Sequence, residues 1–113
     1  MTNILITSAS RKVSLVRSFQ SALRRRGGGE VIAVDINPKA PALYFADRHF
    51  LVPRSHTPEF LPELLRLCQR ERVGLLVPTR DEELPLFADA RAQFEQAGTR
   101  VLVASAETVR VCQ

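Results

Sequence analysis

Cysteine is scarce in this sequence: only Cys68 and Cys112 occur among 113 residues, and tryptophan is absent. The two cysteines lie far apart and form no CxxC pair, which argues against a zinc site and against the disulfide framework of a small secreted protein. We therefore expect two reduced thiols. No apolar run approaches the ~20 residues that span a bilayer, and no basic leader with a hydrophobic stretch marks an export signal. These absences predict a cytoplasmic protein with no membrane partner.

Motifs of several enzyme classes are also missing. The sequence has no P-loop, no GxGxxG turn, no nucleophile elbow and no metal-ligand spacing. His49 and His56 are isolated, and an isolated histidine is more often a packed or solvated side chain than a catalytic base. We therefore assign no catalytic residue and no metal ligand.

The charge balance is weakly basic, with a net charge of +4 and a pI of about 9.8. Such a value can indicate a nucleic-acid partner. Here, however, the basic residues are dispersed except at Arg24, Arg25 and Arg26, which lie at the predicted C-terminal end of a helix, where cations complement the helix dipole. Few aromatic side chains are available to stack on bases. We expect no nucleic-acid partner.

The hydrophobic pattern is that of alternating strands and helices. Short apolar runs typical of strands buried on both faces cover residues 4–7, 31–34, 49–52, 74–77 and 101–103. Apolar residues recur at helical spacing over residues 13–23, 61–68 and 84–94, and residues 107–113 begin another helix. This alternation predicts an α/β fold: a doubly wound, Rossmann-like parallel sheet of about five strands with helices on both faces, in one domain covering residues 1–113.

Prolines and polar residues set the local expectations between these elements. Asn37, Pro38 and Pro41 predict a long irregular loop after the second strand. Thr57 is a candidate N-cap for the next helix, but Pro62 would fall inside that helix and remove a backbone donor. The sequence leaves the start of that helix open.

Ligands of doubly wound sheets bind at the carboxyl ends of the strands, so the segments that follow the strands are the candidate site. The first is Ser8, Ala9, Ser10 and Arg11. Small side chains there allow a ligand to approach the backbone, and amides at a helix start favour an anion, with Arg11 or Lys12 adding positive charge. The alternative is a tight turn in which Ser10 only caps the helix.

Two further segments carry acidic side chains. Asp35 follows the second strand and could accept hydrogen bonds from a polyol hydroxyl, although an Asx turn that ends the strand explains it equally well. Thr79, Asp81 and Glu83 follow the fourth strand; acids at a helix start stabilise the dipole, but they also suit a crevice that holds an amine, hydroxyl or carboxylate group. We predict substrate-binding roles for Ser8 to Arg11, Asp35, Thr79, Asp81 and Glu83.

In combination and in order along the chain, these motifs resemble the N-terminal (pre-ATP-grasp) domain of ATP-grasp ligases, and most closely that of carbamoyl-phosphate-synthase-like proteins. Ser10 stands where relatives often have glycine. The residues that carry the resemblance are Ile4 to Thr7 with Ser8 to Arg11, Val34 to Pro38, Ala40 to Leu43, and Pro78, Thr79, Asp81, Glu83 and Leu84.

The resemblance implies the substrate-side domain of a larger enzyme. Such a ligase uses ATP and magnesium to activate a carboxylate as an acyl phosphate, which an amine then attacks; the ligands of ATP and magnesium lie in later domains. The chain then resembles a domain truncated from a longer protein, with the ATP-grasp domains as partners, no cofactor of its own and no activity when isolated. Apolar surface exposed by the missing domains favours a homo-oligomer.

Two other functions stay open from the residues alone. The first turn and Asp35 also suit a nicotinamide-dinucleotide-binding domain of an oxidoreductase, although the glycines of that motif are absent. A non-catalytic ligand-binding module on the same scaffold is the third hypothesis, because a fold does not fix a function.

Overall fold

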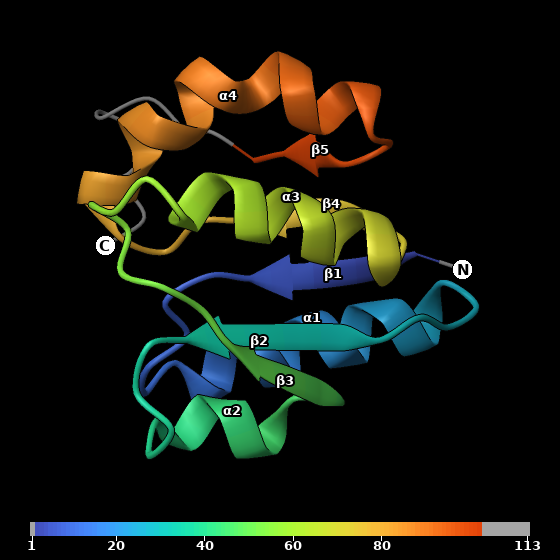
Figure 1. Ribbon diagram of the computed structural model, residues 1–113. Coiled ribbons are helices and arrows are strands. Elements are labelled where there is room, and N and C mark those ends of the chain that lie inside the picture. The colour runs from blue at the N-terminus through green and yellow to red at the C-terminus, as the bar shows by residue number, and fades with distance from the viewer. Residues whose placement is uncertain (1, 103–113) are drawn as a thin grey trace.

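The computed structural model describes residues 2–102, which form a parallel β-sheet flanked by helices (Figure 1). The elements in chain order are β1 (Asn3–Ile6), α1 (Val13–Arg25), β2 (Val31–Asp35), α2 (Pro41–Phe45), β3 (Arg48–Leu51), α3 (Phe60–Arg70), β4 (Val73–Val77), the 3-10 turn η1 (Asp81–Glu83), α4 (Leu84–Gln96) and β5 (Arg100–Val101).

The strands are all parallel and lie in the order β3-β2-β1-β4-β5. The chain starts in the middle strand, builds outward through β2 and β3, and then returns to add β4 and β5 on the other side. Figure 1 shows α1 behind the sheet and α3 in front of it. The predicted doubly wound α/β fold is confirmed, and its topological switch point lies between β1 and β4.

Each face of the sheet has its own hydrophobic core. In β1, Ile4 and Ile6 pack with α1 and α2, whereas Leu5 packs with α3 and α4. Side chains alternate between the two faces of a strand, so a strand that is apolar at every position must be covered twice. The apolar run of residues 4–6 in β1 therefore accounts for a middle strand buried on both sides.

Two prolines have a different effect from the one expected. The loop predicted after β2 contains the short helix α2. Pro41 is compatible with this helix because it is the first helical residue, where a backbone N–H would have no intrahelical acceptor. Pro62 likewise lies in the first turn of α3 and removes no helical hydrogen bond. Thr57 is not the N-cap of α3: Glu59 holds that position, and the Thr57 hydroxyl donates to the carbonyl oxygen of Arg54 at 2.7 Å.

Several predicted boundaries move by a residue or lie outside the described part. Strand β3 begins at Arg48, one residue before the predicted start, and ends at Leu51. The prediction that this strand is buried on both faces is wrong, because β3 lies at the edge of the sheet and is mostly exposed. Strand β5 covers Arg100–Val101. Val103, Cys112 and the helix predicted from residue 107 lie outside the described residues.

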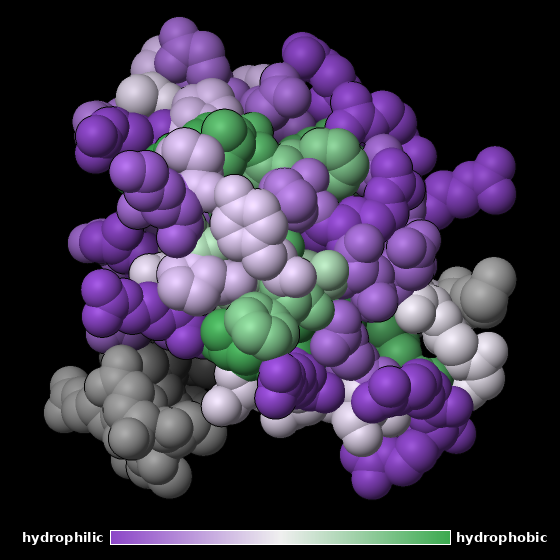
Figure 2. Space-filling model, turned by 90° about the horizontal axis from the view of Figure 1, so that it is seen from below, coloured by the Kyte–Doolittle hydropathy of each residue, from purple (hydrophilic) through white to green (hydrophobic). Residues whose placement is uncertain are grey.

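Apolar side chains reach the surface beside α2 and β3. Tyr44, Phe45 and Leu51 are exposed there, and the guanidinium of Arg17 lies 4.8 Å from the centre of the Phe45 ring. Figure 2 views the molecule from this side and shows the apolar groups separated by polar ones. The predicted homo-oligomer stays a prediction. Within residues 2–102, no helix is both long and apolar enough to cross a bilayer.

The Cys68 thiol of α3 is expected to react slowly. It is 1% exposed, and burial raises its pKa to about 11, against a smaller lowering by a hydrogen bond with Thr99. The thiolate is the reactive form, so its fraction near pH 8 should be about 100-fold below that of an ordinary thiol. In a Cys112→Ser variant, an aromatic disulfide reagent should modify Cys68 slowly in the native protein and rapidly in denaturant. Equal rates in both states would contradict this packing.

Candidate functional site

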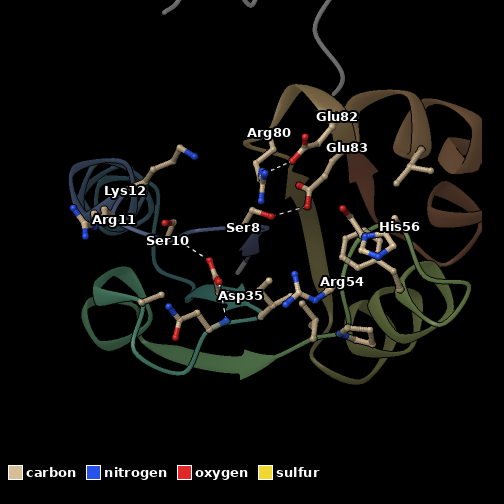
Figure 3. A pocket seen from close by; sticks show the side chains of 18 of the residues that line it. Ser8, Ser10, Arg11, Lys12, Asp35, Arg54, His56, Arg80, Glu82 and Glu83 are labelled. Carbon is tan, nitrogen blue, oxygen red and sulfur yellow. Dashed lines mark hydrogen bonds and ion pairs between the residues drawn. The ribbon is translucent and has the colours of Figure 1, made fainter.

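A cavity of about 970 Å³ opens at the carboxyl ends of the strands (Figure 3). It spans the switch point, and its lining comes from the segments that follow β1, β2, β3 and β4. The polar and charged residues in the lining are Ser8, Ser10, Arg11, Lys12, Asp35, Asn37, Lys39, Arg54, Ser55, His56, Arg80, Glu82 and Glu83. The apolar part includes Val52, Phe60 and Leu86.

The turn after β1 has an unusual backbone. Ser8 and Ser10 have φ angles of 48° and 47°, in the left-handed region that residues other than Gly, Asn and Asp rarely occupy. Two amides of this turn already donate within the chain, that of Ala9 to the Val34 carbonyl at 3.2 Å and that of Lys12 to the Ala9 carbonyl at 2.8 Å. The turn is therefore held by the neighbouring strand β2 and by itself.

Asp35 holds this turn from the end of β2. One carboxylate oxygen accepts the backbone N–H of Ser10 at 2.8 Å, and the other accepts the N–H of Asn37 at 3.0 Å. The second bond is the Asx turn expected as one alternative, whereas the first spans 25 residues of sequence. Ser10 does not cap α1: Lys12 is the N-cap residue, without a side-chain hydrogen bond.

Glu83 holds the same turn from the β4 side. It is 1% exposed, and its two carboxylate oxygens accept hydrogen bonds from the Thr7 hydroxyl at 2.9 Å and from the Ser8 hydroxyl at 2.6 Å. Figure 3 shows Ser8 and Glu83 meeting in the middle of the cavity. Because Ser8 gives its only hydroxyl hydrogen to Glu83, its oxygen offers the cavity lone pairs alone.

Thr79 completes this bracing. Its hydroxyl lies 2.7 Å from the Thr7 carbonyl and 3.0 Å from the Ser8 carbonyl, and it accepts a hydrogen bond from the Lys12 ammonium at 3.2 Å. A side chain from the end of β4 thus fixes the end of β1 and positions the ammonium of Lys12.

The structure brings most of the predicted site residues together. Ser8, Ser10, Arg11, Asp35 and Glu83 line the cavity. The remaining three do not belong to the lining: Ala9 is fully buried, Thr79 acts as a brace, and Asp81 is exposed in η1. Their predicted substrate-binding roles stay predictions.

Sequence reasoning missed Lys39, Arg54 and Ser55, which also line the cavity. A signal for the last two was present, because they follow β3 directly, as the chosen segments follow their own strands. All carboxyl ends of a parallel sheet meet at one edge, so the segment after β3 belongs to the same site. Among the described residues, no three histidine, cysteine or acidic side chains gather as metal ligands.

Comparison with protein families identifies this architecture. A model described as the PylC-like, N-terminal domain matches residues 4–102. The chain belongs to the PylC-like N-terminal domain family. This result confirms the resemblance to an N-terminal domain of ATP-grasp ligases, whereas the finer likeness to carbamoyl-phosphate-synthase-like proteins stays a prediction. No match is found among curated proteins.

Several solved structures contain a region that is similar to the PylC-like domain in three dimensions. A glycinamide-RNase-transformylase T from Mycobacterium tuberculosis is 31% identical with a TM-score of 0.58, over 95% of this chain and 30% of that chain. The biotin carboxylase domain of a single-chain bacterial carboxylase is 22% identical with a TM-score of 0.61, over 97% and 26%. An N5-carboxyaminoimidazole ribonucleotide synthetase from Thermotoga maritima is 17% identical with a TM-score of 0.56, over 100% and 28%. The last two support the fold alone, and the chain spans under a third of each relative.

Proposed function

We propose that this domain forms the substrate-side wall of an ATP-grasp ligase that joins a carboxylate to an amine. The carboxylate is activated as an acyl phosphate, and the amine displaces the phosphate. ATP and magnesium bind in the remaining domains of that enzyme, and the cavity at the switch point receives part of the substrate. The observation that carries the proposal is the family match over residues 4–102, which covers every segment that lines the cavity.

The composition of the cavity supports a role in binding rather than in the chemical step. The two buried acids, Asp35 and Glu83, have both oxygens engaged by the chain itself. The chain therefore supplies shape and charge to the substrate, while phosphoryl transfer belongs to the partner domains.

The dinucleotide hypothesis receives no support from this geometry. In dinucleotide-binding folds the acid after the second strand accepts the ribose hydroxyls. Here the carboxylate of Asp35 instead accepts a hydrogen bond from the Ser10 amide, and the residue is 7% exposed. A titration with NAD(H) and NADP(H) is expected to show no binding, and saturable binding would restore this alternative.

The test is an assay of the full-length protein for ADP release across a panel of carboxylates and amines. We expect ADP formation that requires one member of each class, and the matching amide product. The 113-residue chain alone is the control and should release no ADP. If the full-length protein releases no ADP with any pair, a non-catalytic binding module becomes the better hypothesis.

A further inference from the structure

The charges around the cavity are unbalanced. Five basic residues and three acidic residues line it, and each acid is already engaged. Asp35 and Glu83 accept hydrogen bonds from the chain, and Glu82 forms an ion pair with Arg80. The lining as a whole therefore carries an excess of two positive charges. The basic residues outside the Arg80–Glu82 ion pair are Arg11, Lys12, Lys39 and Arg54.

Several backbone amides of the first turn are already engaged within the chain. The N–H of Ser10 donates to Asp35 at 2.8 Å, and those of Lys12 and Val13 donate to the Ala9 and Arg11 carbonyls, each at 2.8 Å. With these three amides engaged, the cationic side chains of the lining are the candidate groups to bind an anion.

Arg54 is the side chain best placed for that purpose. It follows β3, on the opposite side of the cavity from the first turn, and Figure 3 shows its guanidinium extending toward the central Ser8 and Glu83 pair from one side while Arg80 approaches from the other. Among the described residues Arg54 has no acidic partner within ion-pair distance. Arg80, by contrast, is already paired with Glu82.

The Arg54 side chain is exposed, and the buried residues Val52 and Phe60 line the cavity beside the segment that carries it. The planar guanidinium can bind both oxygens of one carboxylate.

We propose that Arg54 is a specificity-determining residue that binds the carboxylate of the substrate in this cavity. This inference rests on the proposed ligase function, which it extends by assigning the group that recognises the acid. Arg54 positions that carboxylate within the cavity, and the Ser8 oxygen beside it accepts a hydrogen bond from an N–H or O–H of the same ligand.

The first experiment uses the 113-residue chain and simple probes. Backbone amide NMR spectra are recorded during titration with sodium propionate, with inorganic phosphate, and with ethylammonium chloride at matched ionic strength. We expect propionate and phosphate to shift the amides of Ser8, Ser55 and His56 and to compete with each other, and ethylammonium to leave them unchanged. Arg54→Gln should weaken propionate binding about tenfold, as expected for loss of one charge-assisted hydrogen bond.

The control is Arg24→Gln, which removes the same charge from the exposed C-terminal end of α1, at the opposite end of the molecule (Figure 1). This variant should bind propionate as the wild type does. Equal weakening by both variants would mean a nonspecific charge effect and would overturn the proposal, as would an unchanged affinity in Arg54→Gln.

The second experiment separates this inference from the proposed function. In the full-length enzyme, Arg54→Gln should raise KM for the carboxylate about tenfold while leaving KM for ATP unchanged. A rise in KM for ATP instead would assign Arg54 to the nucleotide phosphates and overturn the inference, with ligase activity intact. If the chain binds propionate specifically but the full-length protein releases no ADP, the carboxylate subsite at Arg54 is supported and the proposed ligase function is rejected.

Discussion

Glu83→Ala is expected to lower the free energy of unfolding by about 3 kcal/mol, because it leaves the buried Thr7 hydroxyl and the Ser8 hydroxyl without their acceptors and opens a void. Glu83 is 1% exposed, and it accepts hydrogen bonds from residues 76 and 75 positions earlier. Urea unfolding followed by circular dichroism measures the loss.

Two variants control this prediction. Glu83→Gln keeps the shape and one acceptor, so we expect a loss of about 1 kcal/mol. Glu82→Ala removes the adjacent, exposed acid and its surface ion pair with Arg80, and should change stability by less than about 0.5 kcal/mol. Equal stability of the Glu83→Ala and Glu82→Ala variants would show that the hydrogen bonds from Thr7 and Ser8 to Glu83 do not stabilise the turn after β1.

Gly29→Ala is expected to destabilise the protein by a similar amount, about 3 kcal/mol. Gly29 has a φ angle of +129°, and a Cβ atom there would lie 2.0 Å from the carbonyl oxygen of Thr2. Neither backbone can move freely, because Ile4 donates to the Glu30 carbonyl at 2.9 Å and Glu30 donates to the Asn3 side chain at 3.0 Å. The midpoint of thermal unfolding reports the effect.

Gly27→Ala provides the matched comparison. Its φ angle is +101°, but no atom lies within 4 Å of the added Cβ. This substitution carries only the cost of a left-handed backbone, about 1 kcal/mol. Equal losses for the two alanine variants would show that backbone conformation, and not the close approach to Thr2, makes Gly29 necessary.

Most of the fold could be predicted from the sequence because a strand that is buried on both faces is apolar at successive positions. Strands β1, β2 and β4 coincide with runs of apolar residues, whereas the edge strands β3 and β5 begin with an exposed arginine and carry a weaker signal. The short helix α2 was missed because Pro38 and Pro41 are ordinary signs of a loop. Pro41 acts as a helix start here, and that role depends on Ala42 and Leu43 packing against α1, which no local pattern reports.

The site was less predictable, for a physical reason. The ends of strands indicate where polar residues meet, so Asp35 and Glu83 were found. The sequence does not reveal that both carboxylates are engaged by the β1 turn, because hydrogen bonds across 25 and 75 positions leave no periodic trace. Arg54 was overlooked because a single arginine after a short strand is indistinguishable from a solvated one until the cavity is seen.

The central position of β1 has a consequence for synthesis on the ribosome. β1 is made first, yet it pairs with β2 on one side and with β4 on the other. Until Val77 has left the exit tunnel, Ile4, Leu5 and Ile6 have an open edge that another nascent chain can occupy. The interval between synthesis of β2 and of β4 is thus the period in which this domain most needs protection by a chaperone.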